Sequence, residues 1–243
     1  MRYNRKEFLS KQVLDWFPTA TRTRIPSFLY RPELWLDASD LSTITESSGS
    51  VSSWADKSGY GRNATQATGA NQPTTGSVTI NGLNVLSFDG ATDTMTFASG
   101  FMNNKHQGTI FSVFTTTSGA GTGTPIVFGD DYADFSANMY TTFGTNSRKN
   151  FVHGITLTNV NSFCIVGALG YWQAFINGVS KSLTTTNTVS FNSGVAQFFL
   201  ANDPPAGSRW GGSLAEIIIY SRALSLSEIE TVRLYLKTKW DTL

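Results

Sequence analysis

This 243-residue chain carries its strongest structural signal in Gly211–Trp240, which reads G-G-S-L-A-E-I-I-I-Y-S-R-A-L-S-L-S-E-I-E-T-V-R-L-Y-L-K-T-K-W. Its first part, Ala215–Tyr220, is rich in β-branched and aromatic residues, which suit a packed β-strand. Ser225 precedes Glu228 by three residues, which is the spacing of a capping box at the start of a helix. The stretch therefore predicts a strand followed at once by a helix.

The predicted helix has one apolar face. Leu224 and Ile229 are spaced as a hydrophobic staple around its first turn. The residues expected on the buried face recur at roughly helical spacing: Leu226, Ile229, Val232, Leu236 and Trp240. We therefore expect the helix to pack against the strand that precedes it.

The composition favours a β-rich, loop-rich domain. Hydrophobic residues make up 40% of the chain, which is enough for a core, whereas charged residues are only 14%. Threonine and serine, with 31 and 27 residues, take the polar role, and they favour strands and turns respectively. The single cysteine, Cys164, stands in the apolar run F-C-I-V and predicts a packed thiol. One cysteine excludes an intrachain disulfide.

Charge is distributed unevenly along the chain. Residues 1–32 hold seven basic and two acidic residues, a net charge of +5, whereas residues 33–243 carry −4. The first residues have no uninterrupted apolar segment, so we expect no signal peptide. No apolar run reaches the roughly 18 residues of a membrane span, so we expect no transmembrane segment. The two parts of the chain are predicted to do different work.

Strand signals follow one another from residue 33 onward. Asn177-Gly178 is a strong hairpin signal, because both central residues of a type I′ turn need a positive φ. The predicted strands are short apolar or alternating segments at 34–37, 51–56, 83–88, 94–97, 109–114, 126–128, 139–143, 151–157, 163–169, 171–176, 198–200 and 215–220. Many short strands with turns between them favour a two-sheet sandwich.

Several short motifs carry a resemblance to a known family. In order they are W-L-D-A-S-D at 35–40, W-A-D-K-S-G-Y-G at 54–61, Q-P at 72–73, F-D-G at 88–90, F-I-N-G at 175–178 and the terminal strand and helix. Together, over residues 33–240, they resemble laminin-G-like domains of the concanavalin A-like lectin/glucanase group. The resemblance implies an all-β, two-sheet antiparallel jelly-roll sandwich over residues 33–243, with a C-terminal helix. Residues 1–32 fall outside it, as an N-terminal helical arm.

Catalysis is not expected. Retaining glycosidases of this group resemble one another in a strand with alternating acids, which flank a glycosidic bond. This chain has no such run, and the final strand carries only Glu216. We therefore expect no catalytic residues and no enzyme activity, and keep a glycoside hydrolase as the second alternative.

One acidic cluster is a candidate calcium site. Asp130, Asp131 and Asp134 stand in G-D-D-Y-A-D-F, and hard cations prefer carboxylate and carbonyl oxygens. The resemblance also implies calcium near a ligand rim, where Asp93 and Asp203 are partners from other loops. The alternative, which we favour, is a solvated loop with Asp in turn positions, so we expect no bound cofactor.

Aromatic side chains are candidates for stacking on sugar rings, because they bury apolar sugar faces. Trp210 is the first candidate, at the end of the loop N-D-P-P-A-G-S-R-W, with Arg209, Asp203 and Tyr132 at the same predicted rim. Further candidates are Tyr140, Tyr171 and Trp172. The alternative is that these rings fill the sandwich core. A carbohydrate-binding lectin module is thus the first alternative function.

The N-terminal arm is predicted to dock on another chain. A helix over residues 4–17, closed by Pro18, presents Leu9, Val13, Trp16 and Phe17 on one face, and Arg22 and Arg24 follow in an extended linker. Such a segment also suits a membrane surface or its own sandwich, and nucleic acid is a minor alternative.

Stand-alone chains of this kind are similar to virion proteins of tailed bacteriophages. The resemblance implies a non-catalytic structural or adhesion protein, located in the virion as a capsid decoration or a tail or fibre component. Its partners would be other virion proteins, bound through residues 1–32, and further copies of itself. The outward sandwich would then contact a surface glycan.

Overall fold

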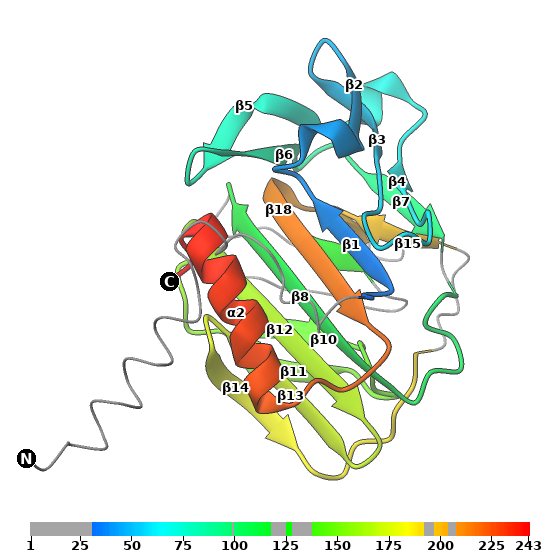
Figure 1. Ribbon diagram of the computed structural model, residues 1–243, viewed down its shortest axis with the longest axis vertical. Coiled ribbons are helices and arrows are strands. Elements are labelled where there is room, and N and C mark those ends of the chain that lie inside the picture. Colours follow the sequence, from blue (N-terminus) through cyan, green and yellow to red (C-terminus); the bar gives the residue numbers. More distant parts are fainter. Residues whose placement is uncertain (1–30, 99, 118–124, 128–137, 192–196, 204–207) are drawn as a thin grey trace, which may run out of the picture.

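The computed structural model describes residues 31–98, 100–117, 125–127, 138–191, 197–203 and 208–243, which are predominantly β (Figure 1). Its strands are β1 (Leu34–Asp37), β2 (Ile44–Ser47), β3 (Ser50–Trp54), β4 (Ala64–Thr65), β5 (Thr74–Ile80), β6 (Leu83–Asp89), β7 (Met95–Ala98), β8 (Gln107–Thr116), β9 (Ile126–Val127), β10 (Asn138–Thr141), β11 (Lys149–Val152), β12 (Asn161–Ala168), β13 (Tyr171–Ile176), β14 (Val179–Thr184), β15 (Gln197–Leu200), β16 (Asn202–Asp203), β17 (Ser208–Arg209) and β18 (Gly211–Tyr220). Helix α2 (Leu226–Trp240) follows β18.

The described strands pair mainly in one large antiparallel sheet. Fourteen strands join in the order β14-β13-β12-β8-β18-β6-β5-β3-β4-β7-β15-β9, with β1 on β18 and β2 on β3. Two small sheets, β10-β11 and β16-β17, stand apart from it. The predicted all-β class with a C-terminal helix is confirmed. The finer prediction of a two-sheet jelly roll is not confirmed, because pairing runs from strand to strand through the large sheet.

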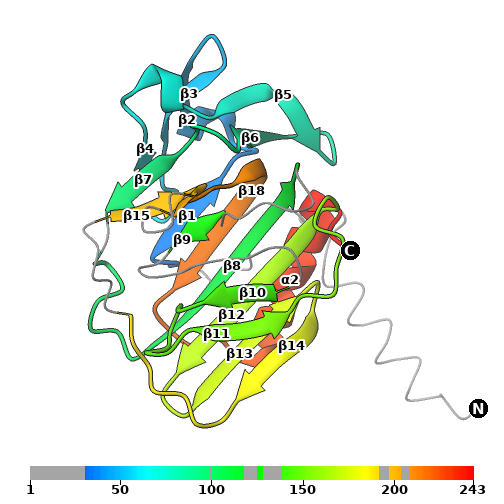
Figure 2. The same cartoon turned by 180° about the vertical axis from the view of Figure 1, so that it is seen from behind.

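Two apolar cores lie on opposite faces of the β18 region. Helix α2 covers one face (Figure 1), and β10 and β11 cross the other face, which Figure 2 turns toward the viewer. Ile217 and Ile219 belong to the core on the β10-β11 side, whereas Ile218 and Tyr220 belong to the core under the helix. This alternation follows from the two-residue period of a strand. Because both faces are covered, every residue of β18 is buried.

The terminal stretch folds largely as its sequence predicts. Ser225 and Glu228 form the capping box reciprocally, and the staple residues Leu224 and Ile229 are both buried. Leu226 is a correction, because its side chain is 63% exposed instead of lying on the buried face. One turn further along the helix Glu230 is exposed as well, so Leu226 lies on the solvent side of α2. Buried Tyr235 and Lys239 complete the face instead.

Strand β18 begins four residues earlier than predicted. Gly211 and Gly212 pair with β6, and Gly212 pairs with β8 as well. A Cβ atom at Gly212 would stand 2.1 Å from the Thr115 carbonyl oxygen and 2.4 Å from the Trp210 ring. Position 212 therefore requires glycine, because the Thr115 carbonyl and the Trp210 ring leave no room for a side chain. Strand propensities alone do not predict such a position.

Two further sequence predictions are confirmed locally. Asn177 and Gly178 both have positive φ, +52° and +78°, as a type I′ hairpin requires. The Cys164 thiol is buried, and burial raises its pKa. The described residues contain no helix long and apolar enough to cross a membrane.

Several predictions fall on residues outside the described ranges. They concern the arm residues Leu9, Val13, Trp16, Phe17, Arg22 and Arg24, and the loop residues Asp130, Asp131, Tyr132 and Asp134. The helical arm, its docking role and the calcium loop therefore stay predictions.

Candidate functional site

A buried polar cluster joins α2 to β18. Glu216 of β18 is fully buried, and each of its carboxylate oxygens accepts two hydrogen bonds. Oε1 accepts from Trp35 Nε1 and the Tyr235 hydroxyl, both at 2.8 Å. Oε2 accepts from Lys239 Nζ at 2.8 Å and Trp240 Nε1 at 2.6 Å. This saturated carboxylate holds the helix on the strand.

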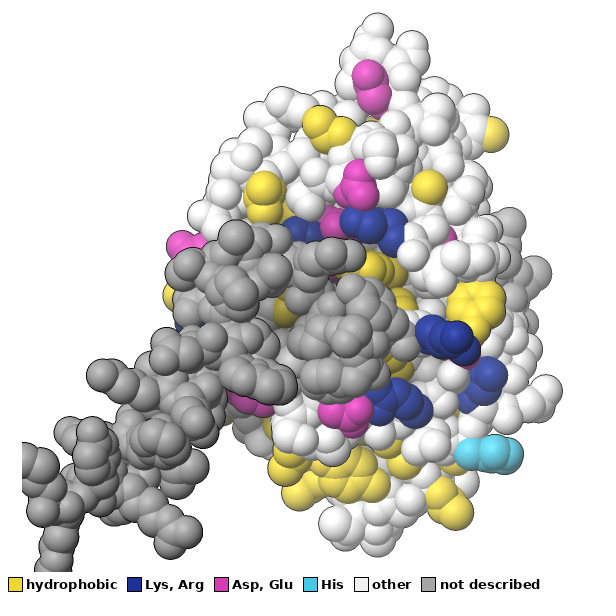
Figure 3. Space-filling model, viewed as in Figure 1, with side chains coloured by type: hydrophobic (Ala, Val, Ile, Leu, Met, Phe, Trp, Pro, Cys, Tyr) yellow, Lys and Arg dark blue, Asp and Glu magenta, His cyan; other side chains and the backbone are white. Residues whose placement is uncertain are grey.

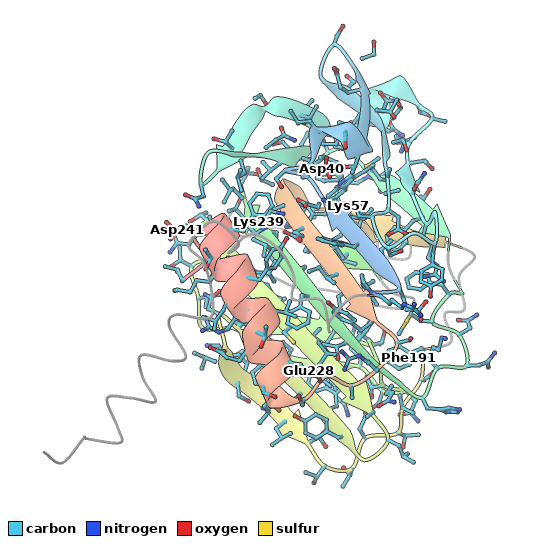
Figure 4. The ribbon with its side chains drawn as sticks, viewed as in Figure 1. Asp40, Lys57, Phe191, Glu228, Lys239 and Asp241 are labelled. Carbon is cyan, nitrogen blue, oxygen red and sulfur yellow. The ribbon has the colours of Figure 1, made fainter. Side chains whose placement is uncertain are left out.

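The cluster extends through Asp37 to the first two sequence motifs. Lys239 Nζ lies 2.6 Å from Asp37, and Lys57 Nζ bridges Asp37 at 2.9 Å and Asp40 at 2.8 Å. Figure 4 labels Lys239, Lys57 and Asp40 at the same end of β1 and β18. The Lys57 ammonium also lies 4.9 Å from the Trp35 ring centre. The two acids of W-L-D-A-S-D, Asp37 and Asp40, therefore both contact the lysine of W-A-D-K-S-G, Lys57.

The electrostatics of this cluster are those of a structural site. Burial raises the pKa of Glu216 despite the Lys239 charge beside it. Burial acts in the same direction on Asp37, but the charge and hydrogen bonds of Lys239, with hydrogen bonds from Lys57 and Ser39, outweigh it and lower the pKa of Asp37. Neither carboxylate is open to a substrate, since Glu216 is 0% and Asp37 only 3% exposed.

Trp210 does not lie at an open rim. Its side chain is 1% exposed, and its ring packs 5.9 Å from that of Phe88 and 5.8 Å from that of Phe114. The prediction that Trp210 stacks on a sugar is therefore wrong for this structure, and the alternative of a core ring holds. Trp172 is likewise buried, with Nε1 donating to the Phe143 carbonyl at 2.9 Å.

The other predicted rim residues are only partly placed. Arg209 is half-buried in β17, and Asp203 lies in β16, opposite Ser208 in the antiparallel register. The side chain of Asp203 lies outside what the structure describes, so a rim shared by Arg209 and Asp203 stays a prediction. Tyr140 of β10 is half-buried, with the Arg148 guanidinium 4.9 Å from its ring centre.

The F-D-G turn holds two carboxylates in different states. Asp89 accepts from the amides of Ala91, Thr92 and Asp93, and although burial acts against it, these hydrogen bonds lower its pKa to about 2. Burial raises the pKa of Asp93 to about 6. Within the described part of the chain, no three His, Cys, Asp or Glu side chains gather as metal ligands. The turn amides therefore account for the low pKa of Asp89 without any ligand.

A different aromatic residue is exposed and fixed in place. Tyr60 lies in the loop at 55–63, and its side chain is 56% exposed. The Arg62 guanidinium stacks between two rings, with its Cζ 4.3 Å from the Tyr60 ring centre and 4.6 Å from that of Phe101. Such cation–π stacking is attractive and orients the ring. Arg62 therefore orients a ring that stays more than half exposed.

The loop that carries Tyr60 is internally braced. Asp56 accepts from the amide of Ser58 at 2.8 Å, its hydroxyl at 2.6 Å and the amide of Arg62 at 3.1 Å. The glycines on either side of Tyr60 have φ of +93° and +70°, which let the chain turn sharply around it. The aromatic ring is thus set on a rigid turn before any ligand arrives.

Glu33 anchors the base of this stack. Its Oε2 lies 2.9 Å from Arg62 Nη1, and its backbone carbonyl accepts a second hydrogen bond from the same guanidinium nitrogen. Its Oε1 accepts from the Ser221 hydroxyl at 2.5 Å, and Lys105 Nζ lies 3.7 Å away. Figure 3 shows Lys and Arg side chains beside hydrophobic ones on the face that carries β1. We call Tyr60, Arg62, Phe101, Glu33 and Lys105 the Tyr60 cluster.

The Tyr60 cluster has the components of a sugar site. An exposed aromatic face buries the apolar face of a sugar ring, and charged donors beside it hydrogen-bond the substituents. The motif W-A-D-K-S-G-Y-G indicates the fold, but its spacing does not show that Tyr60 belongs to an exposed cluster. The available signal is an aromatic residue between two turn glycines, with an arginine two positions later.

No known protein family matches the sequence of this chain. No curated protein matches it by sequence either. Comparison with solved structures therefore bears on the fold alone.

The chain is similar to a sialidase from Trypanosoma rangeli solved with the inhibitor DANA, at 16% identity and a TM-score of 0.60, over 96% of this chain and 39% of that one. It is also similar to domain 4 of an extracellular arabinanase from Geobacillus stearothermophilus, solved with arabinotriose, at 14% identity and a TM-score of 0.58, over 84% and 98%. The binding domain of botulinum neurotoxin serotype G aligns at 14% identity and a TM-score of 0.57, over 87% and 54%. The chain thus spans less than half of the sialidase, and these likenesses show an all-β sandwich fold.

Proposed function

We propose that residues 33–243 form a carbohydrate-binding domain that holds a sugar ring against Tyr60. The observation that carries the proposal is an exposed tyrosine fixed from behind by Arg62, which is itself clamped by Glu33. A ring that is already ordered loses little conformational freedom on binding, so stacking contributes to affinity. The arabinanase domain of similar fold was solved with arabinotriose, which supports a sugar ligand for this kind of sandwich.

The test is binding to a glycan array by the full chain and by Tyr60→Ala. We expect the wild-type chain to bind a defined set of glycans and Tyr60→Ala to lose about tenfold in affinity, the equivalent of one aromatic stack. Tyr140→Ala is the comparison variant, because Tyr140 is also paired with an arginine, lies on β10 and is itself a candidate from the sequence; a loss in Tyr140→Ala alone would place the sugar there instead. Equal binding by Tyr60→Ala would reject the site. Repeating the array with calcium and with a chelator tests the calcium alternative.

We propose that binding occurs without turnover. Glu216, the one acid of the final strand, is buried and its oxygens are occupied by four donors, so it is not free to protonate a glycosidic oxygen or to attack an anomeric carbon. Mass spectrometry of each bound oligosaccharide after long incubation provides the test. Intact oligosaccharide supports a binding module, and a hydrolysed product would favour a glycoside hydrolase.

Residues 1–32 form the basis of a separate proposal, which rests on the sequence. Their net charge of +5 and the predicted apolar face support an anchor in a larger assembly, such as a bacteriophage virion. Deleting residues 1–32 should abolish incorporation into particles and leave glycan binding unchanged. Unchanged incorporation would reject the anchor without affecting the sugar site.

A further inference from the structure

The Tyr60 cluster contains a cation that the fold does not use fully. Both oxygens of Glu33 already have closer partners, Arg62 at 2.9 Å and Ser221 at 2.5 Å. Lys105 Nζ stays 3.7 Å from Glu33, beyond hydrogen-bonding distance, and its side chain is 41% exposed. An ammonium group has three donors, so Lys105 retains hydrogen-bonding capacity toward solvent.

The unused charge beside Tyr60 is a cation. Glu33 is shared by Arg62 and Lys105, and the Asp56 carboxylate of the same loop is occupied by backbone amides and the Ser58 hydroxyl, so Lys105 is the charged group of the cluster with donors to spare. Arg222, which follows Ser221, is also 41% exposed at the side chain, although it pairs with Glu228 at 2.7 Å. Residues 33–243 as a whole carry −4. An exposed ammonium with unused donors favours a negatively charged group as its partner.

Tyr60 and Lys105 belong to one continuous group of side chains. The Tyr60 ring contacts Arg62 at 4.3 Å, Arg62 contacts Glu33 at 2.9 Å, and Glu33 contacts Lys105 at 3.7 Å. Phe101, which closes the stack, lies four residues before Lys105, whose amide donates to the Met102 carbonyl at 3.1 Å. The same short segment therefore sets both the stack and the cation.

From this geometry we infer that the ligand of the Tyr60 cluster is an acidic glycan, whose ring stacks on Tyr60 while a carboxylate or sulfate group binds Lys105. The inference rests on the proposed sugar site and adds the class of sugar. Arg62 contributes a second donor set close to the same anion, but its main partner stays Glu33. The recognised chemistry is a negatively charged group attached to a sugar ring.

The experiment compares matched pairs of acidic and neutral glycans. Oligogalacturonides and their methyl esters test the carboxylate, and sulfated galactan oligosaccharides and their desulfated forms test the sulfate. We expect the full chain to bind the acidic member of at least one pair about tenfold more tightly, and this preference to fall severalfold when salt rises from 50 to 500 mM, because added salt screens exposed charges. Which pair responds distinguishes a carboxylate from a sulfate ligand.

Variants separate this inference from the proposed function. Lys105→Gln should reduce binding of the acidic member about fivefold and leave the neutral member unchanged, whereas Tyr60→Ala should weaken both. Lys181→Gln on β14 is the matched lysine control. Equal binding of acidic and neutral members, or an unaffected Lys105→Gln, would overturn the acidic class and leave the sugar site standing. Failure to bind any glycan would overturn both.

Discussion

Strand β1 has a cluster of charges and aromatic rings at each end, and the two clusters have opposite character. At the Asp37 end, Glu216 and Lys239 are buried, and every oxygen of Glu216 is occupied. At the Glu33 end, Tyr60 is exposed, and Lys105 is only loosely held. Both use a carboxylate, a cation and aromatic side chains. The difference is helix α2, which covers the cluster at the Asp37 end and leaves the one at the Glu33 end open to solvent.

The comparison shows why residue type alone does not identify a site. A buried charge network must be satisfied completely, because each unpaired group in a low-dielectric interior destabilises the fold. An exposed cluster tolerates unused donors, since water satisfies them until a ligand arrives. Spare hydrogen-bonding capacity at an accessible surface is therefore the feature that marks the Glu33 end.

The largest effect should come from removing the carboxylate of the closed cluster. Glu216→Ala removes the acceptor of the Trp35, Tyr235 and Trp240 donors. It also leaves the buried Lys239 ammonium with Asp37 as its one carboxylate partner, and should lower the free energy of unfolding by about 3 to 5 kcal/mol. Urea unfolding followed by tryptophan fluorescence measures it. Glu230→Ala removes an exposed ion pair on α2 and should cost less than about 1 kcal/mol. Equal costs would show that the closed cluster is not structural.

The cation of the same cluster should give a pH-dependent effect. Lys239→Met leaves Asp37 and Glu216 buried without their shared cation and should destabilise the fold by about 3 kcal/mol at pH 7. Burial already raises the folded-state pKa of Glu216, and loss of the cation raises it further; the pKa of Asp37 rises as well, although Lys57 stays beside it. A raised carboxyl pKa favours the fold at low pH and loses that contribution as pH rises through the folded-state value.

The destabilisation by Lys239→Met should therefore shrink by at least about 1 kcal/mol between pH 7 and pH 4. Lys237→Met, an exposed lysine of the same helix, is the control and should show no such dependence. Unfolding curves at the two pH values provide the measurement. A destabilisation independent of pH would mean that Lys239 acts through packing instead of charge.

The F-D-G turn gives an intermediate case between the two clusters, because Asp93 is buried but carries no cation partner among the described residues. Its pKa of about 6 lies above the ordinary value of 3.8, so its contribution to stability is present below pH 4 and lost as pH rises toward 6. At pH 8 the buried Asp93 carboxylate is charged, and Asp93→Asn replaces it with a neutral amide, so the variant should stabilise the fold by about 2 kcal/mol. At pH 4 Asp93 is already neutral, and the variant should change stability little. Thermal unfolding at both pH values tests this. An equal shift at both would contradict the assignment.

Local signals predicted the parts of the fold that depend on local chemistry. The capping box at Ser225, the Asn177-Gly178 turn and strands such as Tyr171–Ile176 follow from residue preferences within a few positions. Strand β5 was not predicted, because Thr74–Ile80 is largely exposed and lacks an apolar pattern. The pairing of many strands in one sheet depends on contacts far apart in sequence, which no local period encodes.

The candidate site was harder to predict for a related reason. The Pro- and Gly-rich loop before Trp210 favours an exposed ring, yet the ring lies in the core beside Phe88 and so close to Gly212 that a side chain there would not fit. The sequence does not point to Tyr60, because its ring is oriented by Arg62, which also lies over Phe101, 41 positions away from Tyr60. Whether a ring faces core or solvent is a tertiary property, so composition of a loop decides it poorly.

The smallest effect on stability, and the sharpest on the comparison, should come from Arg62→Lys. Lysine keeps the charge beside Glu33 but cannot stack as a plane between Tyr60 and Phe101 or donate in a fixed fork. We expect a loss of about 1 kcal/mol or less in unfolding free energy, with severalfold weaker glycan binding because Tyr60 is no longer held. Calorimetry of unfolding and of binding separates the two. If binding is unchanged, rigidity of Tyr60 is not what makes the open cluster a site, and the contrast with the closed cluster reduces to exposure alone.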